Sequence, residues 1–202
     1  MRRLIQEFVL GQSLRHHWIA KGKFTNESIN RIDWEALRHA VKRKPMHHQR
    51  WATKFINGFS GSNYKLHQIG QYSTGLCPRC ELFAETTTHI LFCQNVKAQE
   101  SRREALVSFD RWLETSQTRW DIRETIINTL TDLQPTSTLA SHIPFNPYDE
   151  TIHMAACHQD SIGLQNMLEG FICVEWRKIM SHYYKEIKSN RNVQSWTAGL
   201  HM

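Results

Sequence analysis

The chain of 202 residues is 40% hydrophobic and contains seven Trp and nine Phe, which is typical of a globular protein and excludes a disordered one. Its five cysteines are an odd and sparse set, which excludes a disulfide-rich secreted scaffold and favours a reducing intracellular compartment, either cytoplasmic or nuclear. The net charge of +6 at pH 7 comes from residues 1–60, where twelve Lys and Arg face four Asp and Glu, and no apolar run reaches the ~18 residues of a membrane span.

Residues 1–60 are predicted to form a basic helical N-terminal segment. Trp34, Leu37 and Val41 recur at helical spacing and predict a helix over 32–45. Because their shared spacing places them on one face, we expect these three side chains to face the core.

A second helix is predicted over 47–59. Trp51 and Phe55 lie on one face of it, so we expect Trp51 to pack inward rather than to stack on a ligand. Gly58 is interpreted as its C-cap.

Basic side chains cluster where these two predicted helices meet. The candidates for nucleic-acid contact are Lys42, Arg43, Lys44, Arg50 and Lys54. Arg50 and Lys54 are spaced i, i+4 and form a stripe. A local basic block favours a polyanionic partner, RNA or DNA, and the alternative is a solvated helical surface with no partner.

Residues 61–133 are predicted to contain a cysteine cluster and two amphipathic helices. Residues 61–75 have turn residues at both ends and are interpreted as a short strand or an irregular lead-in to the cysteines. Apolar side chains at helical spacing predict helices over 95–115 and 120–133.

The remaining chain divides into a connector, 134–150, and a C-terminal helical segment, 151–202. Prolines and Ser/Thr residues mark the connector. A long helix is predicted over 160–190, with a weak point at Gly170. The end of the chain, "VQSWTAGLHM", is interpreted as the start of a truncated element.

The stretch "CPRCELFAETTTHILFC" carries the clearest chemical pattern. Cys77, Cys80, His89 and Cys93 follow the spacing C-x2-C-x8-H-x3-C. A C-x2-C turn presents two thiolates, and a histidine and a cysteine four residues apart on a helix present two more ligands, which is a tetrahedral Cys3His zinc arrangement. Four protein ligands fill the coordination sphere, so the expected zinc is structural.

Other interpretations of the cysteine cluster fit the sequence less well. A disulfide does not account for His89, and a redox C-x-x-C pair requires a strand–turn–helix context. A deaminase-type catalytic zinc requires an H-x-E motif that the chain lacks. Three cysteines that only pack in a core remain an alternative. Cys157 and Cys173 fall outside the pattern and are expected to be small core residues rather than ligands.

No catalytic constellation is recognisable. The histidines available for chemistry are His67, His142, His153 and His158, and none belongs to a nucleophile–base–orienter set. The expected fold class is mainly α, a helical domain with a small Cys3His zinc knuckle, and the expected protein is not an enzyme.

The cysteine stretch resembles the zinc-binding segment downstream of the polymerase domain in non-LTR (LINE-like) retroelement reverse transcriptases. "RWATKFINGFSG" and "SIGLQNMLEGFICVEWRKIMSHYY" are similar to segments that flank it in that family, so the resemblance spans roughly residues 20–195, although only 77–93 is specific. The polymerase motif Tyr/Phe-x-Asp-Asp is absent from this chain.

The resemblance implies a non-catalytic, zinc-binding C-terminal fragment of such an enzyme. Its expected partners are nucleic acid and other retroelement proteins, with no membrane. The alternatives are a protein-interaction or structural module and a degenerate remnant without independent function.

Overall fold

The computed structural model describes residues 14–57, 59, 61–134, 136–144 and 150–200, and it is mainly helical, as the sequence predicts. These residues form no β-strand. Two isolated antiparallel bridges join Ile32 to Cys173 and Leu76 to Ala84. Among the same residues, no helix combines the length and apolarity needed to cross a membrane.

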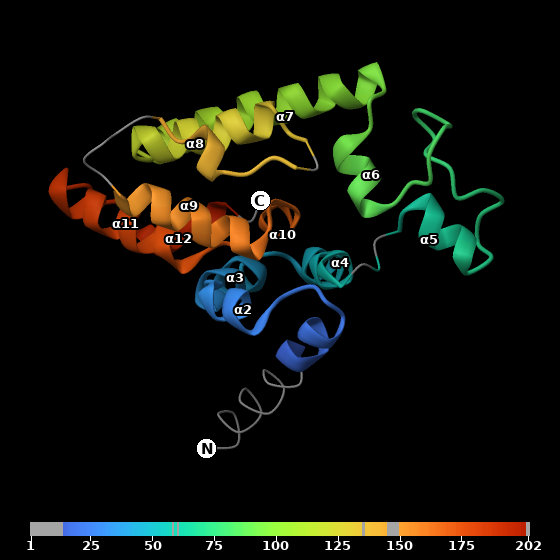
Figure 1. Ribbon diagram of the computed structural model, residues 1–202, viewed down its shortest axis with the longest axis horizontal. Coiled ribbons are helices and arrows are strands. Elements are labelled where there is room, and N and C mark those ends of the chain that lie inside the picture. The colour runs from blue at the N-terminus through green and yellow to red at the C-terminus, as the bar shows by residue number, and fades with distance from the viewer. Residues whose placement is uncertain (1–13, 58, 60, 135, 145–149, 201–202) are drawn as a thin grey trace.

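Most of the helices are joined by short connections, whereas a long loop over residues 69–86 joins α5 to α6 (Figure 1). After a helical stretch at 14–20, they are α2 (Asn26–Arg31), α3 (Trp34–Lys42), α4 (Met46–Ile56), α5 (Asn63–Gln68), α6 (Thr87–Phe92), α7 (Val96–Thr115), α8 (Trp120–Thr131), the 3-10 turn η1 (Ala140–His142), α9 (Glu150–Ile162), α10 (Leu164–Leu168), α11 (Val174–Glu186) and α12 (Val193–Gly199).

Polar side chains set where several of these helices begin. Thr25 forms a capping box with Ser28, and Asp33 accepts a hydrogen bond from the Ala36 backbone N–H at 3.0 Å. Asn95 and Asn192 cap α7 and α12 in the same way. Each such cap satisfies an N–H group that has no partner inside the helix and contributes about 1 kcal/mol.

The main core joins the two ends of the chain. Phe171, just before α11, is fully buried, and its ring contacts those of Trp18, Phe24 and Trp34 with centroids 4.9–6.0 Å apart. In Figure 1 the blue N-terminal helices accordingly lie beside the orange and red C-terminal ones. The described residues of the N-terminal segment, from 14 to 57, and those from 150 to 200 therefore share one hydrophobic core.

Helices α7 and α8 cover the other side of the C-terminal helices. Their buried residues Leu113, Ile122 and Ile126 belong to the same core. The indole of Trp196 in α12 donates a hydrogen bond to the Thr118 hydroxyl at 2.8 Å. Residues near the end of the chain thus form a packed helix, α12.

Two predicted segments differ from the structure. Residues 61–75 contain helix α5, so the predicted strand or irregular lead-in was wrong. The predicted helix over 160–190 is divided into the end of α9, α10 and α11. The divisions fall at Gly163 and Gly170, whose φ angles of 101° and 96° are incompatible with a continuous right-handed helix. The proposed C-cap Gly58 and residues 145–149 of the connector lie outside the described residues.

Candidate metal centre and basic surface

A tight turn presents the first two candidate ligands. The Leu76–Ala84 bridge closes the turn, and the Cys77 N–H donates to the Phe83 carbonyl at 2.8 Å. Glu81, directly after Cys80, adopts a φ of 56°, a left-handed conformation that reverses the chain. Residues 76–84 thus form the knuckle that the C-x2-C spacing predicts.

The other two candidate ligands come from α6 and its end. Thr86 caps this helix by accepting a hydrogen bond from the His89 N–H at 3.0 Å. His89 lies inside the helix, and Cys93 follows its last residue as the C-cap. The cap fixes the start of the helix and thereby the direction of the imidazole.

The four side chains converge on one point. Their ligand atoms all lie within 4.8 Å of one another. The Cys77 and Cys93 sulfurs are 3.9 Å apart, and the Cys80 sulfur is 3.3 Å from His89 Nε2. Ligand atoms around a tetrahedral ion are about 3.3–3.8 Å apart when the bond lengths are ~2.0–2.3 Å. The group could therefore hold a metal ion with small adjustments.

The thiols have different acidities. Hydrogen bonding from the Leu82 backbone lowers the pKa of Cys80 to about 6, and burial raises the pKa of Cys93. A thiolate is the form that binds metals, so the lowered pKa of Cys80 favours binding and the raised pKa of Cys93 opposes it.

The knuckle is attached to the start of α7. Ala98 of α7 packs against the buried Cys77 and Cys93 in a small cluster separate from the main core. Asn95 donates to the Arg79 carbonyl at 2.6 Å, and Arg102 donates to the Cys93 carbonyl at 2.8 Å. These hydrogen bonds hold the two halves of the candidate centre in register.

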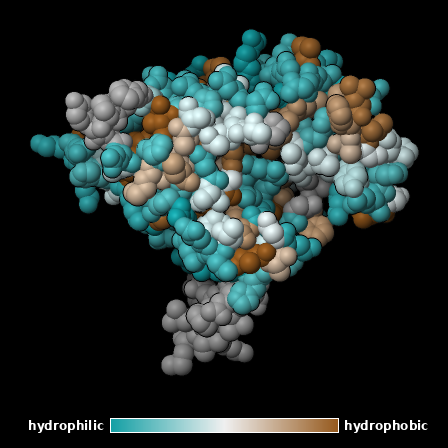
Figure 2. Space-filling model, viewed as in Figure 1, coloured by the Kyte–Doolittle hydropathy of each residue, from teal (hydrophilic) through white to brown (hydrophobic). Residues whose placement is uncertain are grey.

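Apolar side chains are exposed around the knuckle. Leu82 is 74% exposed and Phe83 63%, and Ile90 is also exposed. Figure 2 shows apolar surface over this part of the molecule, at the right of the view. Clustered exposed apolar residues are typical of interaction surfaces.

The predicted basic residues lie at the junction of α3 and α4. Lys42, Arg43, Arg50 and Lys54 are exposed, and Lys44 is half-buried. Arg43 is within 3.4 Å of the Ser195 hydroxyl, and within the described residues the five side chains take part in no ion pair. We call Lys42, Arg43, Lys44, Arg50 and Lys54 the basic α3–α4 surface.

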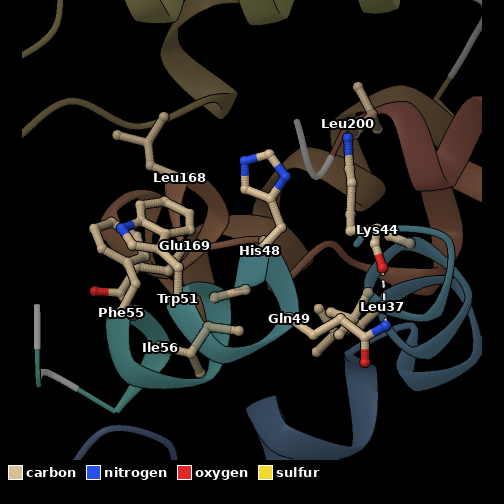
Figure 3. A pocket seen from close by; sticks show the side chains of 14 residues that line it. Leu37, Lys44, His48, Gln49, Trp51, Phe55, Ile56, Leu168, Glu169 and Leu200 are labelled. Atoms are coloured by element: carbon tan, nitrogen blue, oxygen red, sulfur yellow. Dashed lines mark hydrogen bonds between the residues drawn. The ribbon is translucent and has the colours of Figure 1, made fainter. Parts of the chain in front are cut away.

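The prediction that Trp51 packs inward was wrong. Helix α4 has no buried residue, and Trp51 is 58% exposed, with its ring stacked on Phe55 at a centroid distance of 5.0 Å. Figure 3 shows the two rings side by side on α4, across a hollow of about 190 Å³ from Leu168. Lys44 lines the same hollow, so the basic surface adjoins an accessible aromatic platform.

The two cysteines outside the knuckle differ in exposure. Cys173 is fully buried, as expected, whereas Cys157 is exposed, so its assignment to the core was wrong. Burial raises the pKa of Cys173 to about 12, and its thiol donates to a Glu175 carboxylate oxygen at 2.8 Å. His158 of α9 lies beside this pair, a grouping that no spacing in the sequence indicates because the histidine comes from a different helix than Cys173 and Glu175.

Comparison of the chain with models of known protein families, with characterised proteins and with solved structures gives no match.

Proposed function

We propose that this chain is a non-catalytic helical module that is stabilised by zinc and contacts nucleic acid through the basic α3–α4 surface. The observation that carries the proposal is the position of Trp51, which is exposed and stacked on Phe55 beside basic side chains that have no ion-pair partner in the described residues. Such a surface offers charge to phosphates and an aromatic face to an unstacked base.

Zinc is the ion that fits the knuckle. Three sulfurs and one imidazole nitrogen are soft or borderline ligands, which disfavours calcium, magnesium and manganese. Four protein ligands leave no position for a reactive water, so the ion acts on stability rather than on a substrate. Glu85, the acid nearest in sequence to α6, accepts a hydrogen bond from the Asn63 backbone at 2.7 Å and so has a structural role.

The resemblance to the C-terminal region of retroelement reverse transcriptases supports a template-binding role. A chain of this kind, without the paired aspartates of a polymerase, would contact an RNA or an RNA–DNA template, together with other retroelement proteins, and leave synthesis to a separate catalytic domain.

Salt-dependent binding to single-stranded RNA tests the proposal. Because five phosphate contacts release counterions, affinity should fall roughly 10²- to 10³-fold between 50 and 200 mM salt. Substituting Arg43, Arg50 and Lys54 with Ser should reduce the affinity. It should also reduce the slope of log affinity against log salt concentration. The control triple variant, Arg103, Arg111 and Lys185 to Ser, removes the same charge from exposed sites on α7 and α11 and should retain the slope.

A second candidate function is protein interaction, favoured by the exposed Leu82 and Phe83 on the knuckle. Absence of measurable RNA and DNA binding at low salt, or an equal loss in both triple variants, would exclude the basic α3–α4 surface as a specific contact. The knuckle surface would then be the better candidate.

A further inference from the structure

We propose that His158, Cys173 and Glu175 form a second metal site, distinct from the knuckle. His158 lies in α9, Cys173 is the residue before α11, and Glu175 is in the first turn of α11. Their ligand atoms all lie within 4.8 Å of one another. This inference does not depend on the proposed function.

The separations are close to those of a coordination sphere. The Cys173 sulfur is 2.8 Å from Glu175 Oε2, and His158 Nδ1 is 3.8 Å from the same oxygen. Around a tetrahedral ion with one sulfur, one nitrogen and one oxygen ligand, these atoms would be about 3.3–3.6 Å apart. Shifts of under about 1 Å in the side chains would therefore accommodate an ion.

The histidine provides an independent indication. His158 Nδ1 is buried and has no hydrogen-bond partner in the part of the chain that the structure describes. Buried polar atoms nearly always have a partner, and an orphaned one requires an explanation. This nitrogen is directed into a group that already holds a thiol and a carboxylate, so a cation at their centre would satisfy it.

The backbone around the thiol is firmly positioned. The Cys173 N–H donates to Gln159 Oε1 at 2.7 Å, and the Gln159 amide donates to the Phe171 carbonyl at 3.0 Å. Cys173 also forms the isolated bridge with Ile32. Because α2, α9 and α11 meet here, the donors are held together by the main core and do not require the ion for folding.

The charges leave one carboxylate oxygen for the ion. Lys178 lies 3.1 Å from Glu175 Oε1, while Oε2 faces Cys173 and His158. Arg31 lies close enough to act on the Cys173 thiol electrostatically, so it opposes a cation there. Binding forms a metal–sulfur bond, breaks the S–H bond and releases the thiol proton to solvent, so it replaces the Cys173–Glu175 hydrogen bond.

The donor set indicates the class of ion. One thiolate, one imidazole and one carboxylate suit a borderline divalent transition metal, of which zinc is the representative. Three protein ligands leave a fourth position for water, unlike the knuckle, whose four ligands close the sphere.

Zinc bound per chain at a fixed micromolar free concentration tests the second site. Glu175→Gln and His158→Gln should each bind one equivalent fewer than the wild type. Glu186→Gln on α11 and His153→Gln on α9 are matched controls and should bind as much as the wild type. Because the knuckle is intact in all five proteins, the difference is independent of its occupancy.

Cobalt(II) substitution supplies a second readout. Thiolate–cobalt bonds absorb in the near ultraviolet, and the three knuckle cysteines contribute to this band in every variant. The band should therefore be stronger in the wild type and both controls than in both site variants, by the contribution of the single thiolate of Cys173. Circular dichroism confirms folding, and if Glu175→Gln is unfolded, His158→Gln decides, because its side chain is 25% exposed and tolerates replacement. Folded site variants that bind as much zinc and give the same cobalt spectrum as the wild type would overturn the proposal. The group would then be explained by the hydrogen bond between the Cys173 thiol and the Glu175 carboxylate alone.

Discussion

Gly199 of α12 lies directly against the indole ring of Trp112 in α7. A Cβ atom on Gly199 would lie 2.0 Å from Trp112 Cζ2 and 2.6 Å from Cη2. No side chain fits in this space, so the backbone of α12 itself packs on the aromatic ring. Trp112 stacks in turn on Phe109, with centroids 5.7 Å apart, which limits how far the indole can move away.

Gly199→Ala should therefore destabilise the protein. The added methyl group must displace either α12 or the Trp112 ring, and overpacking of this kind costs about 1–3 kcal/mol of unfolding free energy. Urea denaturation measures the change. Gly61→Ala is the control, because a Cβ at Gly61 has no neighbour within 4 Å. A loss in Gly61→Ala equal to that in Gly199→Ala would contradict the packing argument.

Tyr184→Phe should lower the unfolding free energy by about 1 kcal/mol at pH 7, because the Tyr184 hydroxyl donates to the Ser116 carbonyl at 2.5 Å and ties α11 to the end of α7. Tyr183→Phe is the neighbouring control. The Tyr183 hydroxyl has no hydrogen-bond partner among the described residues, so this substitution should change the unfolding free energy little.

The contribution of Tyr184 to the unfolding free energy should depend on pH in the alkaline range. Burial raises the pKa of Tyr184 to about 12, above the ~10 of an unfolded tyrosine. The folded state thus favours the neutral phenol. The contribution of this neutral phenol to the unfolding free energy is fully present below pH ~10 and is lost as the pH rises towards 12. The stability advantage of the wild type over Tyr184→Phe should narrow across that interval. A constant advantage from pH 9 to 12 would show that Tyr184 is not the responsible group.

Removal of the zinc ion that we propose for the knuckle should unfold the knuckle and leave the main core folded. The knuckle cluster of Cys77, Cys93 and Ala98 is separate from the core around Phe171. With a chelator, hydrogen exchange should accelerate in residues 76–93 while most of the helical circular dichroism persists. Cys93→Ser should reproduce this behaviour, and Cys157→Ser, at an exposed cysteine, should not. Slow exchange throughout 76–93 in metal-free protein would contradict the prediction.

Trp51→Ala should weaken binding to single-stranded RNA by about 1–3 kcal/mol, the contribution of one base stacked on an aromatic ring. Trp120→Ala is a closely matched control, because Trp120 is 59% exposed and Trp51 58%. Titration of labelled RNA gives both affinities. Equal affinities in the two variants would show that the Trp51 ring does not contribute to nucleic-acid binding.

Long helices with regular apolar spacing could be predicted from the sequence. The predicted helix 95–115 begins one residue before α7 and ends with it, and 120–133 extends two residues beyond α8. Helix α5 was missed because it has six residues, too few for periodicity to be seen. The 160–190 segment was predicted as one helix because its apolar residues continue through Gly163, whose positive φ could not be known in advance.

The two candidate metal sites differ in how far the sequence could reveal them. The knuckle ligands lie within 77–93, so local turn and helix geometry suffices to bring them together. The group of His158, Cys173 and Glu175 depends on the packing of α9 against α11, which only tertiary structure provides. The exposure of Trp51 was likewise outside the reach of periodicity, because a shared face with Phe55 can support stacking at the surface as well as burial.

The shared core of the two chain ends constrains synthesis on the ribosome. Trp18, Phe24 and Trp34 are made early, but their partner Phe171 follows only after residues 35–170, which takes roughly 7–27 s at 5–20 residues per second. The nascent N-terminal helices therefore emerge before their aromatic side chains can contact Phe171. These side chains stay partly exposed to solvent until the C-terminal part of the chain is synthesised. Binding by chaperones to this segment during translation, and sensitivity of the yield to elongation rate, are the expected consequences in the cell.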